Sequence, residues 1–579
     1  MPFATLDYVI ISVYLLVMIG VGLKMKRRAE ASTGDYFTSG RSLPWWLAGV
    51  SMVATTFAAD TPLAVTGIIA AEGIAGNWIW WNFMFSGFIT VFLFARLWHR
   101  AGVMTDVEVI ELRYSGRAAA FLRGFRAVYL ALPINAVIIG WVTLGMAKII
   151  QVMTGLNSWS VLIGLFLLTG LYIVASGLWG VVVTDFFQFI IAMIGALALM
   201  FYALNEVGGV TGLTAGLAER FGPDHFYLDF SPIAHPKILL STVLVWLGVQ
   251  WWASWYPGAE PGGGGYIAQR MFATRDEGEA VKATLFFNLA HYALRPWPWI
   301  LVALTTLIIY PNLADPETGY ALAMVDLLPA GMLGLLSIAF LSAFMSTIST
   351  QVNWGTSYLV NDFYVRFIRP ADSFPNQEAA QKHYVLVARI ATILLIITGI
   401  IVSYFFETVK GGWEFILSLG AGAGLVYMLR WYWWRINAWS EIAAMAAALI
   451  GSMLAGPLGF GDFAAKMIFT TVFTTIIWIS VTFMTSPEDR QVLERFYHKV
   501  RPAGPGWRRL AGEEPQESLR PAIVNTILAV HVVIGTLFGT GHLIFGNYHR
   551  LLVLAPMAVI PAWWLNKRMK AQVAEQREG

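Results

Sequence analysis

The chain has 579 residues, of which 57% are hydrophobic and 13% charged, with a formal net charge of +3 and a mean hydropathy of +0.63. Its apolar runs repeatedly reach the roughly 20 residues that cross a bilayer, so we predict an all-α polytopic membrane protein. The absence of cysteine excludes a disulfide framework and thiol-ligated metal sites, and nothing in the charge pattern indicates nucleic-acid binding.

The apolar runs predict about fifteen membrane spans. The first lacks a signal-peptide cleavage site and is followed at once by the basic segment "KMKRRAE", so we interpret it as a true span. A window of about 19 residues gives the others. The predicted spans lie near residues 6–26, 45–73, 76–99, 119–152, 158–177, 181–205, 236–256, 280–309, 325–366, 383–406, 411–431, 437–455, 463–485, 521–542 and 548–566.

Basic residues predict the orientation of these spans. If the amino terminus is outside, the basic loops and the tail "NKRMK" all fall inside, as the positive-inside rule requires. We therefore predict a multi-pass protein of the plasma or inner membrane with a cytoplasmic carboxyl terminus. The loop 206–235 is then external, and the basic linker 486–520 is cytoplasmic.

Two of the predicted spans contain helix-breaking residues. The second reads "SMVATTFAADTPLAVTG", and the seventh ends "WWASWYPGAEPGGGG", five spans later. Broken helices at corresponding positions of two halves are typical of inverted-repeat transporters with a binding site at the midplane. The alternative is that the prolines only kink these helices, which is common in membranes.

The ninth span carries an unusual polar stretch, "FMSTISTQVNW", from Phe344 to Trp354. Positions 343, 346, 347, 350 and 353 share one helical face. Such hydroxyls often bond back to their own helix and aid packing. Hard cations, however, prefer oxygen ligands, and a broken helix frees carbonyl groups to complete the shell. We therefore predict a cation site on this face.

The sixth span contains an isolated charge. Asp185 lies in "LWGVVVTDFFQFII" between Thr184 and Gln188. A charge near the bilayer centre costs about 2.5–3.5 kcal/mol even on insertion scales, so this carboxylate needs a partner. The alternative is a carboxylate near the interface that is solvated or paired with an arginine.

Four segments together resemble the sodium:solute symporter family, which includes sodium/proline, sodium/sialic acid, sodium/glucose and sodium/galactose symporters. They are "DYFTSGRSLPWWLAGVSMVATTFAADT", "SGLWGVVVTDFFQ", "GYIAQRMFAT" and "SAFMSTISTQVNWGTSYLVNDFY", within residues 36–432. The resemblance implies a LeuT-type 5+5 inverted repeat formed by spans two to eleven. We accordingly divide the chain into a peripheral helix (1–35), the transport core (36–432) and additional helices (433–579).

The resemblance also implies where sodium binds. The main site would use the carbonyl groups of Ala54, Phe57 and Ala343 and the hydroxyl groups of Ser346 and Thr347. A second sodium site, found in some family members, would use Asp185, Ser349 and Thr350. The alternative for Asp185 is a position that only lines the ion exit path.

The substrate site is less well determined. In this fold it lies between the broken helices and the span that follows the second break. The polar and aromatic candidates there are Asp60, Thr61, Trp80, Asn82, Ser254, Tyr256, Glu260, His291 and Arg295. Each has an alternative as an interfacial aromatic, a packing residue or a locally paired charge. The sequence departs here from sugar-transporting members, which puts sugar specificity in doubt.

We therefore predict a sodium-coupled symporter that imports a small polar organic solute by alternating access. An amino acid or amine, an organic acid and a sugar-like compound all remain open, as does the oligomeric state. A sodium-conducting channel, a membrane sensor and a membrane enzyme are the alternatives. The sequence contains no HExxH, GxSxG or P-loop motif, so we predict no enzymatic activity.

Overall fold

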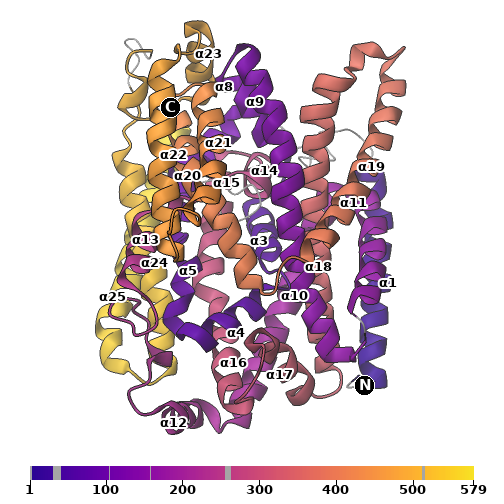
Figure 1. The fold of residues 1–579 in the computed structure, drawn as a ribbon, viewed down its shortest axis with the longest axis vertical. Helices are drawn as coiled ribbons and strands as arrows, with labels where there is room; N and C mark the ends of the chain where they lie inside the picture. Colours follow the sequence, from indigo (N-terminus) through magenta and orange to yellow (C-terminus); the bar gives the residue numbers. More distant parts are fainter. Residues whose placement is uncertain are drawn as a thin grey trace.

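The computed structural model describes residues 3–29, 41–103, 105–156, 158–253, 262–510 and 516–578. Within these ranges the regular elements are helices, apart from one isolated bridge between Leu43 and Thr274. Most long helices run along the vertical axis of Figure 1, with the amino terminus at the bottom and the carboxyl terminus in the upper half. This arrangement confirms the predicted all-α class.

The helices of the first half include several that are segments of a single span. They are α1 (Thr5–Ala29), α3 (Trp45–Thr56), α4 (Thr61–Glu72), α5 (Trp78–Trp81), α6 (Met84–Ile89), α7 (Ala95–Ala101), α8 (Val109–Arg113), α9 (Gly116–Tyr129), α10 (Asn135–Thr154), α11 (Ser158–Glu206), α12 (Gly209–Phe221) and α13 (Leu240–Gly248).

The second half begins after residues 254–261, which lie outside the described ranges together with the predicted break of the seventh span. Its helices are α14 (Gly265–Phe272), α15 (Glu277–Leu289), α16 (Pro296–Ile309), α17 (Gly319–Leu327), α18 (Met332–Ser357), α19 (Gln377–Ser403), α20 (Val409–Tyr432), α21 (Ala438–Ala455), α22 (Phe463–Met484), α23 (Arg490–Val500), α24 (Arg520–Ile544) and α25 (Tyr548–Glu578).

Short irregular turns join helix segments within spans. Three of them are π-helical, namely η3 (Thr90–Phe94), η5 (Leu130–Ile134) and η8 (Ala290–Leu294), and a longer π-helical segment, η10 (Tyr358–Ile368), extends the end of α18. Turns of this kind occur frequently at functional sites, because they displace side chains from the regular helical register.

Apolar length identifies the membrane-crossing elements. Among the described residues, nine helical stretches are long and apolar enough to cross a membrane, and the pair α3 and α4 forms a further, bent one. The bend between α3 and α4 is 56°. This confirms a multi-pass membrane protein whose second span is broken.

The structure differs from the prediction at residues 158–206. We predicted two spans, at 158–177 and 181–205, whereas α11 is one continuous helix over Ser158–Glu206. The stretch contains glycines but no proline. A glycine costs only about 1 kcal/mol in a helix and keeps its N–H donor, so it does not interrupt the hydrogen-bond ladder.

The break in the second span follows from local chemistry. Pro62 lies in the first turn of α4, where its missing N–H has no intrahelical partner to lose. The N–H of Thr61 donates to the carbonyl of Ala58 at 3.3 Å, not to that of Phe57 as in a continuous helix. The Phe57 carbonyl is therefore released from the helical ladder.

The polar helix α18 lies at the centre of the bundle. It packs against α1, α3, α10, α11 and α19, and nearly all of its residues are buried. Figure 1 shows α1 at one edge of the molecule and the additional helices α24 and α25 at the opposite edge. The hydroxyl groups of α18 are thus enclosed by protein.

A buried charge cluster attaches the additional helix α21 to the core. Glu441 is fully buried and pairs with Arg126 at 3.1 Å and Arg430 at 3.3 Å. The hydroxyl of Tyr114 donates to Glu441 at 2.6 Å. Arg113 donates to four carbonyl groups at and after the end of α20, which helix dipoles favour. We call Arg113, Tyr114, Arg126, Arg430 and Glu441 the docking cluster.

Candidate functional site

The structure brings α18 against the break between α3 and α4. The hydroxyl of Thr347 donates to the carbonyl of Thr55 at 3.4 Å, two residues before the released carbonyl of Phe57. Ala54, Phe57, Ala343, Ser346 and Thr347 are all buried. The elements that carry the predicted main sodium ligands therefore meet, and their oxygen atoms are shielded from bulk solvent.

Asp185 lies in the same region and links three helices. Its carboxylate accepts hydrogen bonds from Ser51 on α3 and Ser346 on α18, each at 2.6 Å. The Nε of Arg270 donates to the Ser51 hydroxyl at 3.2 Å, and its Nη2 lies 4.0 Å from the Asp185 carboxylate. Asp185 is thus a buried charge with an arginine partner, and it fixes the hydroxyl of a predicted sodium ligand. We call Ser51, Asp185, Arg270 and Ser346 the Asp185 cluster.

The other two predicted ligands of the second sodium lie one turn further along α18. Ser349 donates to the carbonyl of Ser346 at 3.0 Å, whereas Asp185 takes its α18 hydrogen bond from Ser346. The hydroxyl of Thr350 is buried and has no hydrogen-bond partner among the described residues. A buried hydroxyl without a partner is costly, and this oxygen remains available to a ligand.

Two of the predicted substrate residues surround the end of α3. Arg295 donates to the Thr56 hydroxyl at 2.8 Å and to the carbonyl of Val53 at 3.3 Å. The Nδ1 of His291 lies 3.1 Å from the same hydroxyl. His291 belongs to the π-helical turn η8, which places its ring beside the break. The buried guanidinium of Arg295 therefore lies next to the end of α3, where the second span is interrupted.

Aromatic rings cover this cation and histidine. The Arg295 guanidinium lies 4.9 Å from the ring centre of Trp299 and 6.0 Å from that of Phe57. The ring of Trp80 lies edge-on to His291 at 5.7 Å and stacks on Tyr292 at 6.1 Å. The region combines flat apolar surfaces with one charged donor, as is typical of sites for small polar molecules.

Asp60 and Thr61 lie at the start of α4. Asp60 is buried, packs against Gly145 of α10, and accepts a hydrogen bond from the indole of Trp413 at 3.3 Å. Its second carboxylate oxygen, Oδ1, is buried without a partner among the described residues. Asp60 thus contacts α10 and α20, whereas Arg295 contacts α3.

Asn82 is directed into its own helix. Its amide donates to the carbonyl groups of Trp78 at 2.7 Å and Ile79 at 3.0 Å. The remaining predicted residues, Ser254, Tyr256 and Glu260, lie outside the described residues. The amide NH₂ of Asn82 is thus bonded locally, whereas its side-chain oxygen is buried without a partner among the described residues.

The structure adds three residues that sequence reasoning did not select. Ser51 and Arg270 complete the surroundings of Asp185, and Thr56 joins His291 to Arg295. All three lie inside segments that already indicated the family, "SMVATTF" and "GYIAQRMFAT". Their polar character within apolar spans was the available signal, and only the helix packing reveals their partners.

The chemistry of this region suits a monovalent cation. The oxygen donors at the break are carbonyl and hydroxyl groups, and Asp185 is the single carboxylate bonded to them. In the described part of the chain, no three histidine, aspartate or glutamate side chains are grouped so that they would hold a metal ion. A mostly neutral oxygen set of this kind is matched to sodium better than to a divalent ion.

Comparisons with known proteins agree with this geometry. A sequence model of the sodium:solute symporter family matches residues 36–451. The chain is 23% identical to the sodium/glucose cotransporter of Vibrio parahaemolyticus over 513 residues, which cover 84% of this chain and 91% of that protein. It is 26% identical to sodium/glucose cotransporter 2 of Rattus norvegicus, over 78% of this chain and 70% of that protein.

A solved structure shares the fold. The substrate-bound, outward-open structure of a Na+-coupled sialic acid symporter superimposes with a TM-score of 0.68 at 18% sequence identity. The match covers 84% of this chain and 99% of that one. This likeness confirms the predicted LeuT-type fold.

Proposed function

This chain belongs to the sodium:solute symporter family, and we propose that its main sodium ion binds where the break of the second span meets α18. The protein is a sodium-coupled symporter of a small solute and not an enzyme, as predicted. The proposed ligands are the carbonyl groups of Ala54, Phe57 and Ala343 and the hydroxyl groups of Ser346 and Thr347. The observation that carries the proposal is the contact of Thr347 with the released end of α3.

Asp185 supports the main site through Ser346. Because Ser346 donates its proton to Asp185, the lone pairs of its oxygen remain available to a cation. We further propose a second sodium ion at Asp185, Ser349 and Thr350. The unpaired hydroxyl of Thr350 favours it, and the Arg270 guanidinium competes with it for the carboxylate. An ion at this position therefore has to weaken the contact between Asp185 and Arg270.

The proposed solute is a small polar organic compound held between the break, the Trp80 ring and η8. Relatives are named as carriers of glucose and myo-inositol, and the solved structure as one of sialic acid. Arg295 beside Thr56 favours a solute with a carboxylate or several hydroxyl groups. Coupling follows if sodium orders the break and the ordered break binds the solute, because affinities linked in this way rise reciprocally.

Uptake into proteoliposomes tests the function. Polyols, sugar acids and amino acids are first screened by thermal shift with sodium or potassium, since a ligand of the native state raises its melting temperature. A compound that stabilises only with sodium is then offered as a radiolabel. We expect inward sodium gradients to drive its accumulation. Sodium current without solute uptake would instead identify a channel.

The proposed orientation has the amino terminus outside and the carboxyl terminus in the cytoplasm. It is supported by the basic loops of the sequence and by the two ends of the chain, which lie in opposite halves of Figure 1, and not by the number of predicted spans. Because the chain is free of cysteine, single exposed positions can be labelled cleanly. We expect Gln491→Cys in the linker and Lys570→Cys in the tail to resist an impermeant thiol reagent in intact cells. Asp224→Cys in the external loop is the matched control and should react. Labelling of either of the first two in intact cells would reverse the assignment.

A further inference from the structure

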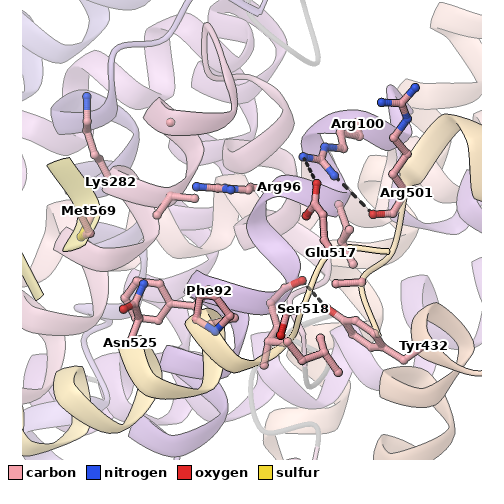
Figure 2. A pocket seen from close by; sticks show the side chains of 18 residues that line it. Phe92, Arg96, Arg100, Lys282, Tyr432, Arg501, Glu517, Ser518, Asn525 and Met569 are labelled. Carbon is pink, nitrogen blue, oxygen red and sulfur yellow. Dashed lines mark hydrogen bonds and ion pairs between the residues drawn. The ribbon is translucent and has the colours of Figure 1, made fainter. Parts of the chain in front are cut away.

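A cavity of about 290 Å³ lies between the transport core and the additional helices (Figure 2). Its walls come from the end of the third span (Phe92–Arg100), the start of α15, the segment before α24, the first turns of α24, and Met569 of α25. The volume is near the lower end of ligand pockets, roughly 300–1,000 Å³. It suits a headgroup or another small polar group.

The walls of this cavity carry more positive than negative charge. Four cationic residues line it, namely Arg96, Arg100, Lys282 and Arg501, against one acid, Glu517. Two of the cations are compensated. Arg100 pairs with Glu277 at 2.9 Å and lies 3.8 Å from Glu517, and Lys282 pairs with Glu279 at 3.1 Å.

Arg96 differs from these neighbours. It is half-buried on the third span, and Figure 2 shows its guanidinium extended across the cavity. Throughout the described ranges, no hydrogen bond or ion pair engages this guanidinium. A half-buried guanidinium without an acidic partner favours an anion, because its planar donors match phosphate oxygens.

A buried amide lies in the same cavity. Asn525 of α24 is 1% exposed, and its side-chain oxygen accepts a hydrogen bond from Nε of Arg568 at 2.7 Å. This bond fixes the amide so that the oxygen is occupied. Its NH₂ group has no partner in the part of the chain that the structure describes. The cavity therefore contains a fixed, buried neutral donor in addition to the guanidinium.

The remaining walls are apolar, with Phe92, Leu93, Leu97, Val281 and Met569 among them. These residues belong to membrane-length helices or to the carboxyl-terminal helix α25. The charged residues lie at the helix ends that the sequence predicts to be cytoplasmic. An occupant thus meets hydrocarbon on one side and cationic donors on the other, which matches an amphiphile better than a free anion.

We propose that this cavity binds the phosphate group of an anionic phospholipid, with Arg96 and the Asn525 amide as its donors. Basic pockets between helices on the cytoplasmic side are a recurrent form of lipid-headgroup site. The lipid would connect α24 and α25 to the third span and α15. The additional helices thereby form a lipid-dependent contact with the transport core. The proposal is independent of where sodium and solute bind.

Native mass spectrometry of the full chain tests the proposal. The purified protein is titrated with dioleoyl-phosphatidylglycerol, with dioleoyl-phosphatidylcholine, and with inorganic phosphate as competitor. We expect phosphatidylglycerol to bind more tightly than phosphatidylcholine. Arg96→Gln should weaken phosphatidylglycerol binding about five-fold, since one cation near a lipid surface contributes on that scale. Arg96→Lys should have a smaller effect because it retains the charge.

Arg490→Gln is the matched control, because Arg490 is a cytoplasmic arginine outside the cavity that pairs with Glu494. Its affinity for phosphatidylglycerol should match the wild type. Equal binding of both lipids, or equal losses in Arg96→Gln and Arg490→Gln, would overturn the proposal. Complete displacement by millimolar phosphate would also overturn it, by identifying a free-anion site. If Arg96→Gln does not fold, Lys282→Gln replaces it and should weaken binding by a smaller factor, whereas no change would count against the site.

Discussion

The docking cluster and the Asp185 cluster both place charged side chains inside a bundle of apolar helices. In the docking cluster two arginines, Arg126 and Arg430, pair with one glutamate, and a third, Arg113, donates to carbonyl groups at the end of α20. The positive charges in the docking cluster are therefore arginine side chains, and the cluster needs no bound cation. The Asp185 cluster adjoins the break, where two oxygen atoms are left over, namely the released carbonyl of Phe57 and the unpaired hydroxyl of Thr350.

This difference shows that buried charge by itself does not identify a binding site. The docking cluster joins two parts of the chain with fixed donors and acceptors, so it stabilises the fold. The region of the break contains oxygen atoms that no described donor engages, so it is suited to bind a mobile cation. The balance of donors and acceptors, and not burial, distinguishes the two regions.

Removing the charge of Glu441 should produce the largest effect. Glu441→Gln leaves Arg126 and Arg430 buried near each other without a carboxylate, and breaking a buried pair in this way costs about 3–5 kcal/mol. We expect a strongly lowered melting temperature in detergent. The sodium half-saturation of the protein that still folds should be unchanged.

Glu494→Gln is the control for this variant. Glu494 pairs with Arg490 across one turn on the solvent-facing side of α23, and such a pair contributes only about 0.3–0.5 kcal/mol. Similar melting temperatures for the two variants would contradict a stabilising function of the docking cluster.

Ser346→Ala combined with Thr347→Ala should affect sodium dependence more than stability, in contrast to Glu441→Gln. This variant loses two oxygen ligands, while the alanine side chains keep the helix packed. Each lost contact should weaken sodium binding by about 0.5–1.5 kcal/mol. The sodium concentration for half-maximal transport should therefore rise about ten-fold or more. The melting temperature without sodium should fall by less than in Glu441→Gln, because Asp185 loses the hydrogen bond from Ser346 but keeps the one from Ser51 and its arginine neighbour.

Ser337→Ala on the same helix is the matched control, because among the described residues its hydroxyl bonds only to the carbonyl of Leu333 one turn earlier. It should leave the sodium dependence unchanged. An unaltered sodium half-saturation in the double variant would reject the proposed main site. The region of the break would then not differ in function from the docking cluster.

Asp185→Asn examines whether one or two ions are transported. An amide oxygen is a weaker ligand for a hard cation than a carboxylate. If the second sodium binds there, the Hill coefficient for sodium should fall from above one toward one, with solute binding at saturating sodium largely retained. Reversal potentials in proteoliposomes should change from two sodium ions per solute toward one.

The double variant Asp185→Asn with Arg270→Gln separates ion loss from an unpaired arginine. It removes both charges of the 4.0 Å contact, so the fold should recover while sodium cooperativity stays low. A wild-type Hill coefficient of one with one sodium per solute would leave Asp185 as a residue that positions Ser346.

Thr350→Val should give the smallest effect. It removes a buried hydroxyl that has no partner in the described residues, so stability should change by less than about 1 kcal/mol in either direction. Sodium half-saturation should rise about two- to five-fold if this oxygen is a ligand. Thr305→Val is the control, since that hydroxyl bonds within its own helix. Equal sodium half-saturation in the wild type, Thr350→Val and Thr305→Val would show that the Thr350 hydroxyl is not a sodium ligand.

The sequence alone determined the class of fold, the break in the second span and the polar face of α18. These features are local, because they depend on apolar length, on Pro62 and on helical periodicity. The one clear difference among the spans, the continuous helix α11, arose in a stretch without proline, where every backbone donor remained available.

Only the tertiary structure decided which polar groups meet. Sequence analysis linked Asp185 to Ser349 and Thr350, whereas the packing of α3, α11 and α18 brings it to Ser51 and Ser346. The packing of the helices likewise places Arg295 beside Thr56. It also places Arg96 in one cavity with Asn525, which lies 429 positions further along the chain. Periodicity defines a face of one helix, but the rotation and depth of neighbouring helices depend on side-chain packing over the whole bundle, which no local pattern contains.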